Sequence, residues 1–311
     1  MKSGGKQNVT EFSIQGLTNV PELQLTIFFI FLFSYVIIIV GNKTIFVVIL
    51  CDPHLHTPMY IFLMNLSLFD IANVSNILPN LLNILLTKHT TISFAGCITQ
   101  MYLFLALTLS EIVLFAAMAY DRYVAICHPL HYFILMSLKH CALLIIASWS
   151  FGFIDAVGHA VQISKMSFCA SHVINHIFCD VEALMKLSCS GTFFVEMLTF
   201  VEGALVPVPA CLLTLTSYIF IISSILKIKS AEGRQKAFST CSSHLICISV
   251  FYGTILFSYM RPTSSYSPKQ DKFFSLLYIV LVPILNPLIY TLKNQEVKNA
   301  LKKLKEKLVC A

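Results

Sequence analysis

A few ionisable side chains interrupt long apolar stretches of this sequence, where burying a charge is costly. Ionisable groups in such surroundings typically bind ligands or ions, relay protons or pair with one another, and they face one another or an internal cavity. Two neutral amides, Asn42 and Asn286, share these surroundings. The ionisable candidates for function are Asp70, Glu111, Asp121, Arg122, Asp155 and Glu202.

The stretches that carry these residues are long enough to cross a membrane. The chain has 311 residues, of which 57% are hydrophobic and 12% charged, and its mean hydropathy is +0.80. Soluble domains carry about 25% charged residues, and a helix needs about 20 apolar residues to span a bilayer. Backbone amides in lipid must bond within their own segment. We therefore predict an all-α membrane protein, a bundle of seven transmembrane helices at Leu25–Leu50, Pro58–Leu86, Phe94–Cys127, Cys141–Val161, Glu196–Leu226, Ala237–Met260 and Phe273–Leu292.

The charges between the spans predict their orientation. Lys and Arg are in modest excess in the segments that share a side with the C-terminus, which places that end in the cytosol. We expect an extracellular N-terminus over residues 1–24, a seven-helix domain over residues 25–292 and a cytoplasmic tail over residues 293–311. The first residues lack the apolar segment of a cleavable signal, so the first span is expected to act as an uncleaved anchor. Asn8 begins an N-glycosylation sequon on the outer end.

The tail predicts contact with the membrane surface. One face of residues 293–311 is apolar and the other is rich in lysine, the pattern of a short amphipathic helix. The net charge of +6 then indicates attraction to anionic membrane lipid rather than to nucleic acid.

Helical spacing along the third span predicts a cavity. Counting back from Arg122, Glu111 lies about three turns away and Thr108 about four, so that all three share one face. This face is charged at its cytosolic end, polar in the middle and apolar toward the outside. A stripe at helical spacing in the sixth span and two residues of the fifth lie at the same depth. The candidate ligand-binding residues are Phe104, Leu105, Thr108, Leu109, Ile112, Glu202, Val206, Tyr252, Ile255, Leu256 and Tyr259.

The polar middle of the bundle has two interpretations. Asn42, Asp70 and Glu111 could hold a sodium ion or a proton, or they could only fix the packing of the helices through hydrogen bonds. The sequence favours neither.

Four cysteines fall on the predicted outer side. Cys97 begins the third span, and Cys169, Cys179 and Cys189 lie in the long loop after the fourth span. An even set in an oxidising compartment predicts two disulfides, with three possible pairings. His172, His176, Cys179 and Asp180 have a spacing that could hold a metal ion. A disulfide would remove the thiolate ligand, so we expect no metal and no other cofactor.

Six segments in order resemble the vertebrate odorant receptors, a family of rhodopsin-like G-protein-coupled receptors. They are Gly41-Asn42, "LHTPMYIFLMNLSLFD" from Leu55, "MAYDRYVAICHPLHY" from Met118, Ser217-Tyr218, "KAFSTCSSHL" from Lys236 and "PILNPLIY" from Pro283. The resemblance extends over most of the chain. Ile61 and Lys293 depart from residues usual in the family, and neither removes a group on which the mechanism depends.

The resemblance implies roles for particular residues. Asp121 would hold Arg122 in an ion pair at rest, and release of the arginine toward the G protein would define the active state. The resemblance also implies disulfides from Cys97 to Cys179 and from Cys169 to Cys189. The residues expected to act in activation or G-protein coupling are Asp121, Arg122, Tyr123, Tyr218, Lys236, His244, Asn286, Pro287 and Tyr290.

The family implies a plasma-membrane receptor for a small volatile odorant, coupled to an olfactory-type stimulatory G protein that raises cyclic AMP. The predicted walls suit a mostly apolar ligand held by one or two hydrogen bonds. Glu202 favours an amine or an alcohol, while Arg261 near the outer rim keeps a carboxylate in consideration.

Two other functions remain as alternatives: a rhodopsin-like receptor for a non-odorant ligand, and a seven-helix transporter or channel. Against transport, the halves of the chain show no inverted repeat. The sequence has no nucleophile elbow, phosphate loop or zinc-binding helix, so an enzyme is not expected.

Overall fold

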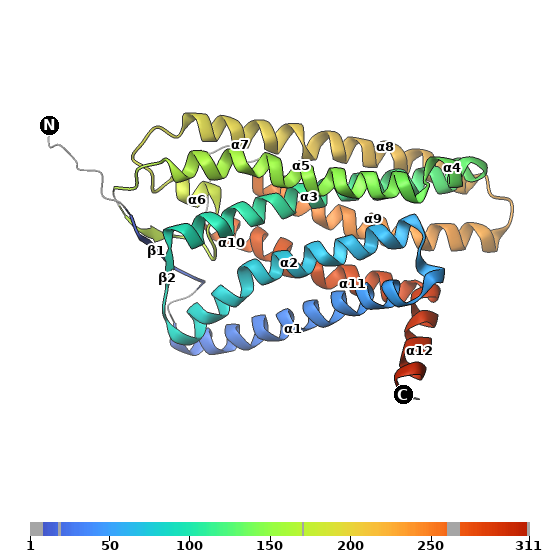
Figure 1. Ribbon diagram of the computed structural model, residues 1–311, viewed down its shortest axis with the longest axis horizontal. Coiled ribbons are helices and arrows are strands. Elements are labelled where there is room, and N and C mark those ends of the chain that lie inside the picture. Colours follow the sequence, from blue (N-terminus) through green and yellow to red (C-terminus); the bar gives the residue numbers. More distant parts are fainter. Residues whose placement is uncertain (1–8, 18–19, 170, 260–267, 310–311) are drawn as a thin grey trace.

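Long apolar helices run side by side along one axis, as the hydropathy pattern predicts (Figure 1). A computed structural model describes residues 9–17, 20–169, 171–259 and 268–309, except for some side chains within these ranges. The uninterrupted long helices are α1 (Pro21–Cys51), α2 (Pro58–Thr87), α3 (Phe94–Cys127), α5 (Leu138–Ser164) and α9 (Ala231–Tyr259). Many large apolar side chains on the outside of the bundle are exposed, Phe33 and Ile219 among them, as lipid contact requires.

Six helical segments of the described chain are long and apolar enough to cross a membrane. The sixth predicted span lies in α9, whose described side chains include a shorter apolar run over His244–Phe257. With α9 included, the bundle has the seven-helix form that the sequence predicts. The helix α1 begins at Pro21 rather than at Leu25, since proline fits the first turn of a helix.

The fifth span is divided, which the sequence analysis did not predict. In place of one helix over Glu196–Leu226, the structure has α7 (Phe193–Leu205) and α8 (Pro207–Leu226). Proline has no backbone N–H to donate and its ring crowds the preceding turn, so Pro207 ends one helix and begins the next.

The seventh span also has an irregular part. It consists of α10 (Pro268–Leu276), a π-helical turn (Leu277–Leu281) and α11 (Val282–Lys293). The turn ends two residues before Pro283, and the Pro283 carbonyl accepts a hydrogen bond of 3.0 Å from the Asn42 amide. The two prolines of this span are therefore accommodated by a local change of helix type and by a bond from α1.

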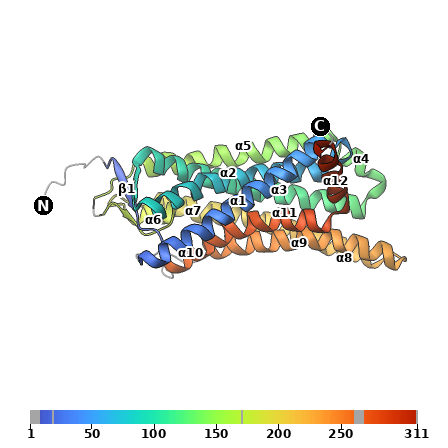
Figure 2. The ribbon, with the colours of Figure 1, turned by 90° about the horizontal axis from the view of Figure 1, so that it is seen from below.

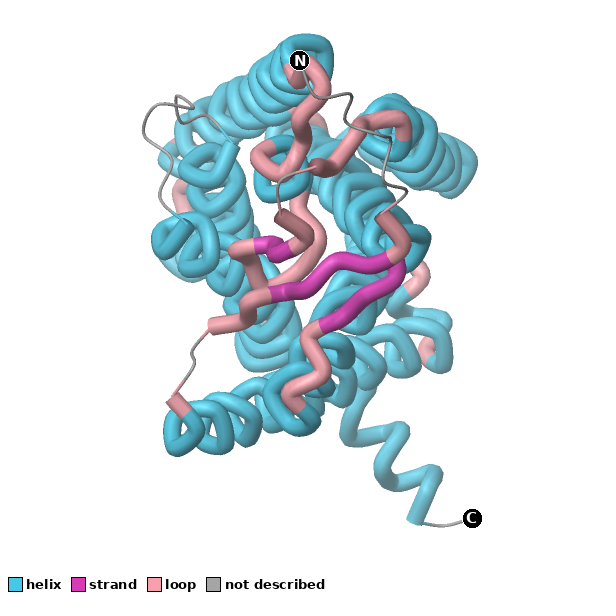
Figure 3. The backbone as a smooth tube through the Cα atoms, turned by 90° about the vertical axis from the view of Figure 1, so that its left-hand side faces the viewer, coloured by secondary structure: helices cyan, strands magenta, loops and turns pink. Residues whose placement is uncertain are grey.

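A small sheet covers one end of the bundle (Figure 3). The strand β1 (Glu11–Ile14) pairs antiparallel with β2 (Thr91–Ser93) and parallel with β3 (Val173–Ile174). Phe12 and Ile14 of β1 are fully buried beneath it. We call this the strand end, and the opposite end, where α11 meets α12 (Gln295–Val309), the tail end.

The tail helix turns away from the bundle axis (Figures 1 and 2). Its apolar residues Val297 and Ala300 are buried, while Lys298 and Lys302 are exposed. The Tyr60 hydroxyl of α2 donates a hydrogen bond of 2.6 Å to Glu296, which fixes the start of α12 to the bundle. The short helix α4 (Tyr132–Leu135) lies between α3 and α5 along the chain.

Candidate functional site

A cavity opens in the half of the bundle nearer the strand end. It contains about 500 Å³ of space not occupied by atoms, part of it open to the surroundings. The walls come from α3, α5, α7, α8 and α9 and from the loop helix α6 (Val181–Met185). The lining residues are Leu105, Thr108, Leu109, Ile112, His159, Val181, Thr199, Glu202, Gly203, Pro207 and Ile255.

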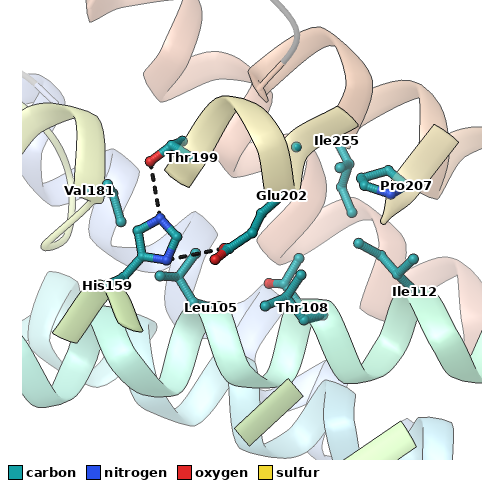
Figure 4. A pocket seen from close by; sticks show the side chains of 11 residues that line it. Leu105, Thr108, Ile112, His159, Val181, Thr199, Glu202, Pro207 and Ile255 are labelled. Atoms are coloured by element: carbon teal, nitrogen blue, oxygen red, sulfur yellow. Dashed lines mark hydrogen bonds and ion pairs between the residues drawn. The ribbon is translucent and has the colours of Figure 1, made fainter. Parts of the chain in front are cut away.

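The cavity is polar at one end and apolar at the other (Figure 4). At the polar end, the Glu202 carboxylate lies 3.1 Å from Nδ1 of His159, and Nε2 of His159 lies 3.0 Å from the Thr199 hydroxyl. Ile112, Pro207 and Ile255 lie toward the other end. Such a cavity can bind an apolar body that carries one polar group.

The structure brings together six of the eleven residues expected to bind ligand: Leu105, Thr108, Leu109, Ile112, Glu202 and Ile255. Phe104 instead packs its ring against Phe178 and Tyr278, with centroids 4.7 and 5.8 Å away. Val206 and Leu256 are half-buried against the main core. The side chain of Tyr259 lies outside the described residues, as does Arg261.

Tyr252 is buried close to the cavity without lining it. Its hydroxyl donates a hydrogen bond of 3.5 Å to the carbonyl of the lining residue Ile112. It also lies one helical turn from Ile255, which lines the wall.

The sequence analysis missed five lining residues: His159, Val181, Thr199, Gly203 and Pro207. A periodic stripe identifies one helix at a time, and it does not indicate which face of α5 or which loop residue completes a wall. A histidine within the apolar fourth span was the available signal for His159.

A second polar cluster lies deeper in the bundle. Asn286 donates a hydrogen bond of 2.9 Å to Asp70, and Tyr278 donates one of 2.9 Å to Glu111. The Tyr278 hydroxyl also lies 3.0 Å from the Thr108 hydroxyl of the cavity wall and accepts a bond of 2.8 Å from Asn73. Tyr278 therefore connects the cavity to the polar core, and the sequence analysis did not select it.

Several oxygen atoms of this core are available for a further ligand. Oδ1 of Asn42, Asn73 and Asn286 and Oε1 of Glu111 are buried and have no hydrogen-bond partner in the described chain. Oxygen atoms of this kind coordinate hard cations. Both interpretations of Asn42, Asp70 and Glu111, a site for a sodium ion or a proton and a polar core that fixes packing, stay hypotheses.

The charged pair near the tail end differs from the implied arrangement. Asp121 accepts a hydrogen bond of 2.9 Å from the Tyr132 hydroxyl, and it makes no ion pair within 4.0 Å with Arg122, both residues being described. Burial and then the Asp121 carboxylate raise the pKa of the Tyr132 phenol, which keeps it a donor. Tyr132 thus bonds one oxygen of the carboxylate, while Arg122 acts on it electrostatically without a direct ion pair.

Arg122 also lies near the fifth and sixth spans. It interacts electrostatically with Tyr218 of α8 and His244 of α9. The Tyr218 hydroxyl lies 2.6 Å from Nδ1 of His244, and both side chains are buried. Tyr218 and His244 therefore link α8 to α9, within the electrostatic influence of Arg122 on α3.

The other residues expected to act in activation make few contacts that bear on that role. The hydroxyl of Tyr123 lies 3.0 Å from the His128 ring, and Asn286 and Pro287 are buried in α11. The side chains of Lys236 and Tyr290 lie outside the described residues, and so does Asn8.

Two disulfides hold the long loop at the strand end. Cys97 is joined to Cys179 and Cys169 to Cys189, the pairs that the resemblance implies. The described residues hold no cluster of three or more potential metal ligands. Because Cys179 is bonded to Cys97, it is not a free thiolate.

His176 is buried in this loop at 1% exposure. Its Nε2 atom lies 3.5 Å from the hydroxyl of Ser275 on α10. Burial lowers the pKa of His176 to about 4 from 6.5; Asp271 opposes the shift and Lys272 adds to it. The folded loop therefore holds a neutral imidazole at neutral pH.

Acid is expected to destabilise the protein through His176. Below about pH 6.5 the unfolded chain binds a proton that the folded chain does not bind until about pH 4, so stability falls as pH falls across this range. At pH 5 the loss is about 2 kcal/mol. The melting temperature of the purified protein should fall more between pH 7 and pH 5 in the wild type than in His176→Gln. Equal pH dependence in the two proteins would contradict the assignment.

The fold and the sites together define a class. A bundle of seven helices with a disulfide-tied loop over a cavity is the form of a multi-pass membrane protein. The profile of the olfactory receptor family matches residues 31–307, and the chain belongs to this family. It is therefore a receptor and not an enzyme.

Individual relatives agree over almost the whole length. The chain is 48% identical to mouse "Olfactory receptor 5AR1" over 296 residues, which cover 95% of this chain and 96% of the relative. It is 46% identical to human "Olfactory receptor 5AR1" with the same coverage. Human "Olfactory receptor 8D4" is 48% identical, with 95% and 94% of the two chains covered.

Proposed function

We propose that this receptor binds a small, mostly apolar odorant in the cavity between α3, α5, α7, α8 and α9. The observation that carries the proposal is a cavity with aliphatic walls and a single polar end formed by His159, Thr199 and Glu202. Apolar walls supply affinity by excluding water, and a few polar groups fix orientation. Tyr252 serves at the cavity floor through its contact with Ile112.

We propose that the bound receptor activates an olfactory-type stimulatory G protein and raises cyclic AMP. The helix α9 links the two ends: Ile255 lines the cavity and His244, three turns away, contacts Tyr218 near Arg122. A ligand that favours a displaced α9 shifts the population toward the state that admits the G protein. The strand end is extracellular in this proposal, with Asn8 available for glycosylation, and the tail helix lies on the inner membrane surface.

The contacts of the inner residues support these roles. Asp121 is bonded to Tyr132 rather than ion-paired with Arg122, so a change in the position of Arg122 relative to Tyr218 and His244 would break no ion pair. The unpartnered oxygens around Asp70 and Glu111 support a sodium ion that stabilises one of the two states. The loop disulfides hold the cavity covering in place.

The test measures the cyclic AMP response to a panel of odorants in cells that express the olfactory-type stimulatory G protein. The wild type should respond, and Arg122→Ala at matched surface display should respond at least tenfold less, because the third span then lacks its link to α8 and α9. A ligand-dependent current or uptake that persists without G protein would favour a channel or transporter instead.

A further inference from the structure

Several carboxyl groups lie around one buried imidazole at the polar end of the cavity. Glu202 of α7 lies 3.1 Å from Nδ1 of His159. Asp155 lies on α5 one turn before His159. Its carboxyl group is a hydrogen-bonding neighbour of the Glu202 carboxyl group. Asp180, in the loop before α6, interacts electrostatically with the same histidine.

This cluster has more carboxyl groups than basic groups. Two carboxyl groups in hydrogen-bonding contact do not both ionise unless a positive charge compensates them. His159 supplies at most one such charge, and none of the described lining residues is lysine or arginine. The cluster therefore carries either a net negative charge or an additional proton.

The acid is the group presented to the cavity. The side chain of Glu202 is 14% exposed, whereas that of His159 is 2% exposed. In Figure 4 the Glu202 side chain extends from α7 into the space above Leu105 and Thr108. Oε2 of Glu202 faces His159 and its carboxyl group also neighbours Asp155, so a cation that enters the cavity here meets two acids.

We propose that this cluster binds the ammonium group of an amine, with its hydrocarbon part against Leu109, Ile112 and Ile255. The proposal rests on the odorant-binding role of this cavity and narrows its ligand class. An alkylammonium ion is charged at neutral pH, as the lysine side chain is. It donates several hydrogen bonds and takes the place of the extra proton. An alcohol brings no charge, and a carboxylate brings the wrong sign.

The experiment uses matched ligands on one hydrocarbon skeleton: an amine, the corresponding alcohol and the corresponding carboxylic acid. Cyclic AMP is recorded from cells with matched surface display. The amine should act at a concentration at least tenfold below that of the alcohol. Glu202→Gln should raise the effective amine concentration at least tenfold, the size expected for loss of a charge-assisted hydrogen bond. The same change should leave the alcohol response within about threefold, because a neutral amide still bonds to a hydroxyl.

Glu196→Gln is the matched control. Glu196 lies on the same helix, is exposed and bonds to Thr192, and it does not line the cavity. The control should respond as the wild type does. If Glu202→Gln lost the responses to amine and alcohol equally, the carboxylate would have a structural role and the proposal would be overturned.

A second measurement separates this proposal from the signalling function. Thermal unfolding of the purified receptor is followed with each of the three ligands. Stabilisation by the amine above the alcohol, lost in Glu202→Gln and kept in Glu196→Gln, supports the ammonium site even where no cyclic AMP response is seen. A wild type that responds to alcohols but is neither activated nor stabilised by amines overturns the ammonium site and leaves the odorant receptor role intact.

Discussion

Receptors that carry Cys97→Ser or Cys179→Ser should be almost absent from the cell surface. The bond between these residues joins α3 to a loop residue 82 positions away, and both side chains are fully buried. A disulfide typically stabilises a protein by about 2–4 kcal/mol. Val181 of the cavity wall follows Cys179 by two residues, so the loop would also lose its position over the cavity.

Surface labelling of intact cells against total protein measures this effect. Cys51→Ser is the matched control, because Cys51 is an exposed free cysteine and should tolerate the same change. The double variant Cys97→Ser/Cys179→Ser should reach the surface no less than either single variant, because each single change already removes the bond. Wild-type display of the single variants would show that the bond is dispensable.

Gly152→Val should separate α5 from α3. A Cβ atom at Gly152 would collide with the carbonyl oxygen of Ala106 and the hydroxyl of Ser110, both on α3. The carbonyl is backbone, so no side-chain rotation relieves it. Small residues permit this close approach of membrane helices, and overpacking costs about 3 kcal/mol where the surroundings cannot adjust.

Thermal unfolding of the purified protein compares this variant with Gly253→Val. A Cβ atom at Gly253 meets nothing within 4 Å, so the control carries the same substitution in a membrane helix without the collision. We expect a large fall in melting temperature for Gly152→Val and a small change for the control. Similar melting temperatures would mean that α5 moves aside at little cost.

Hydropathy and helical period were enough to predict most of the fold. The third span was predicted with the bounds that the structure has, Phe94–Cys127, because its apolar run is sharply limited at both ends. The division of the fifth span at Pro207 was missed, since a hydropathy average does not register one absent N–H donor. The sheet over the bundle was also missed, because its strands are only two to four residues long and come from three distant segments.

The candidate sites were predictable where one helix supplies the residues. Spacing along α3 identified four residues of the cavity wall, Leu105, Thr108, Leu109 and Ile112. His159 and Tyr278 were missed because their importance depends on partners from other helices, Glu202 for one and Glu111 for the other. The contact of Asp121 with Tyr132 likewise depends on how the loop after α3 folds back.

The sheet has a consequence for synthesis of the chain. The first strand cannot complete its pairing until Val173 and Ile174 have left the ribosome, after four spans have entered the membrane. At about 5–20 residues per second, this delay lasts roughly 10–30 seconds. Throughout it, Phe12 and Ile14 lack the neighbours that the loop after α5 supplies, Phe168 and Ile174 among them, so residues translated very early are among the last to reach their final place.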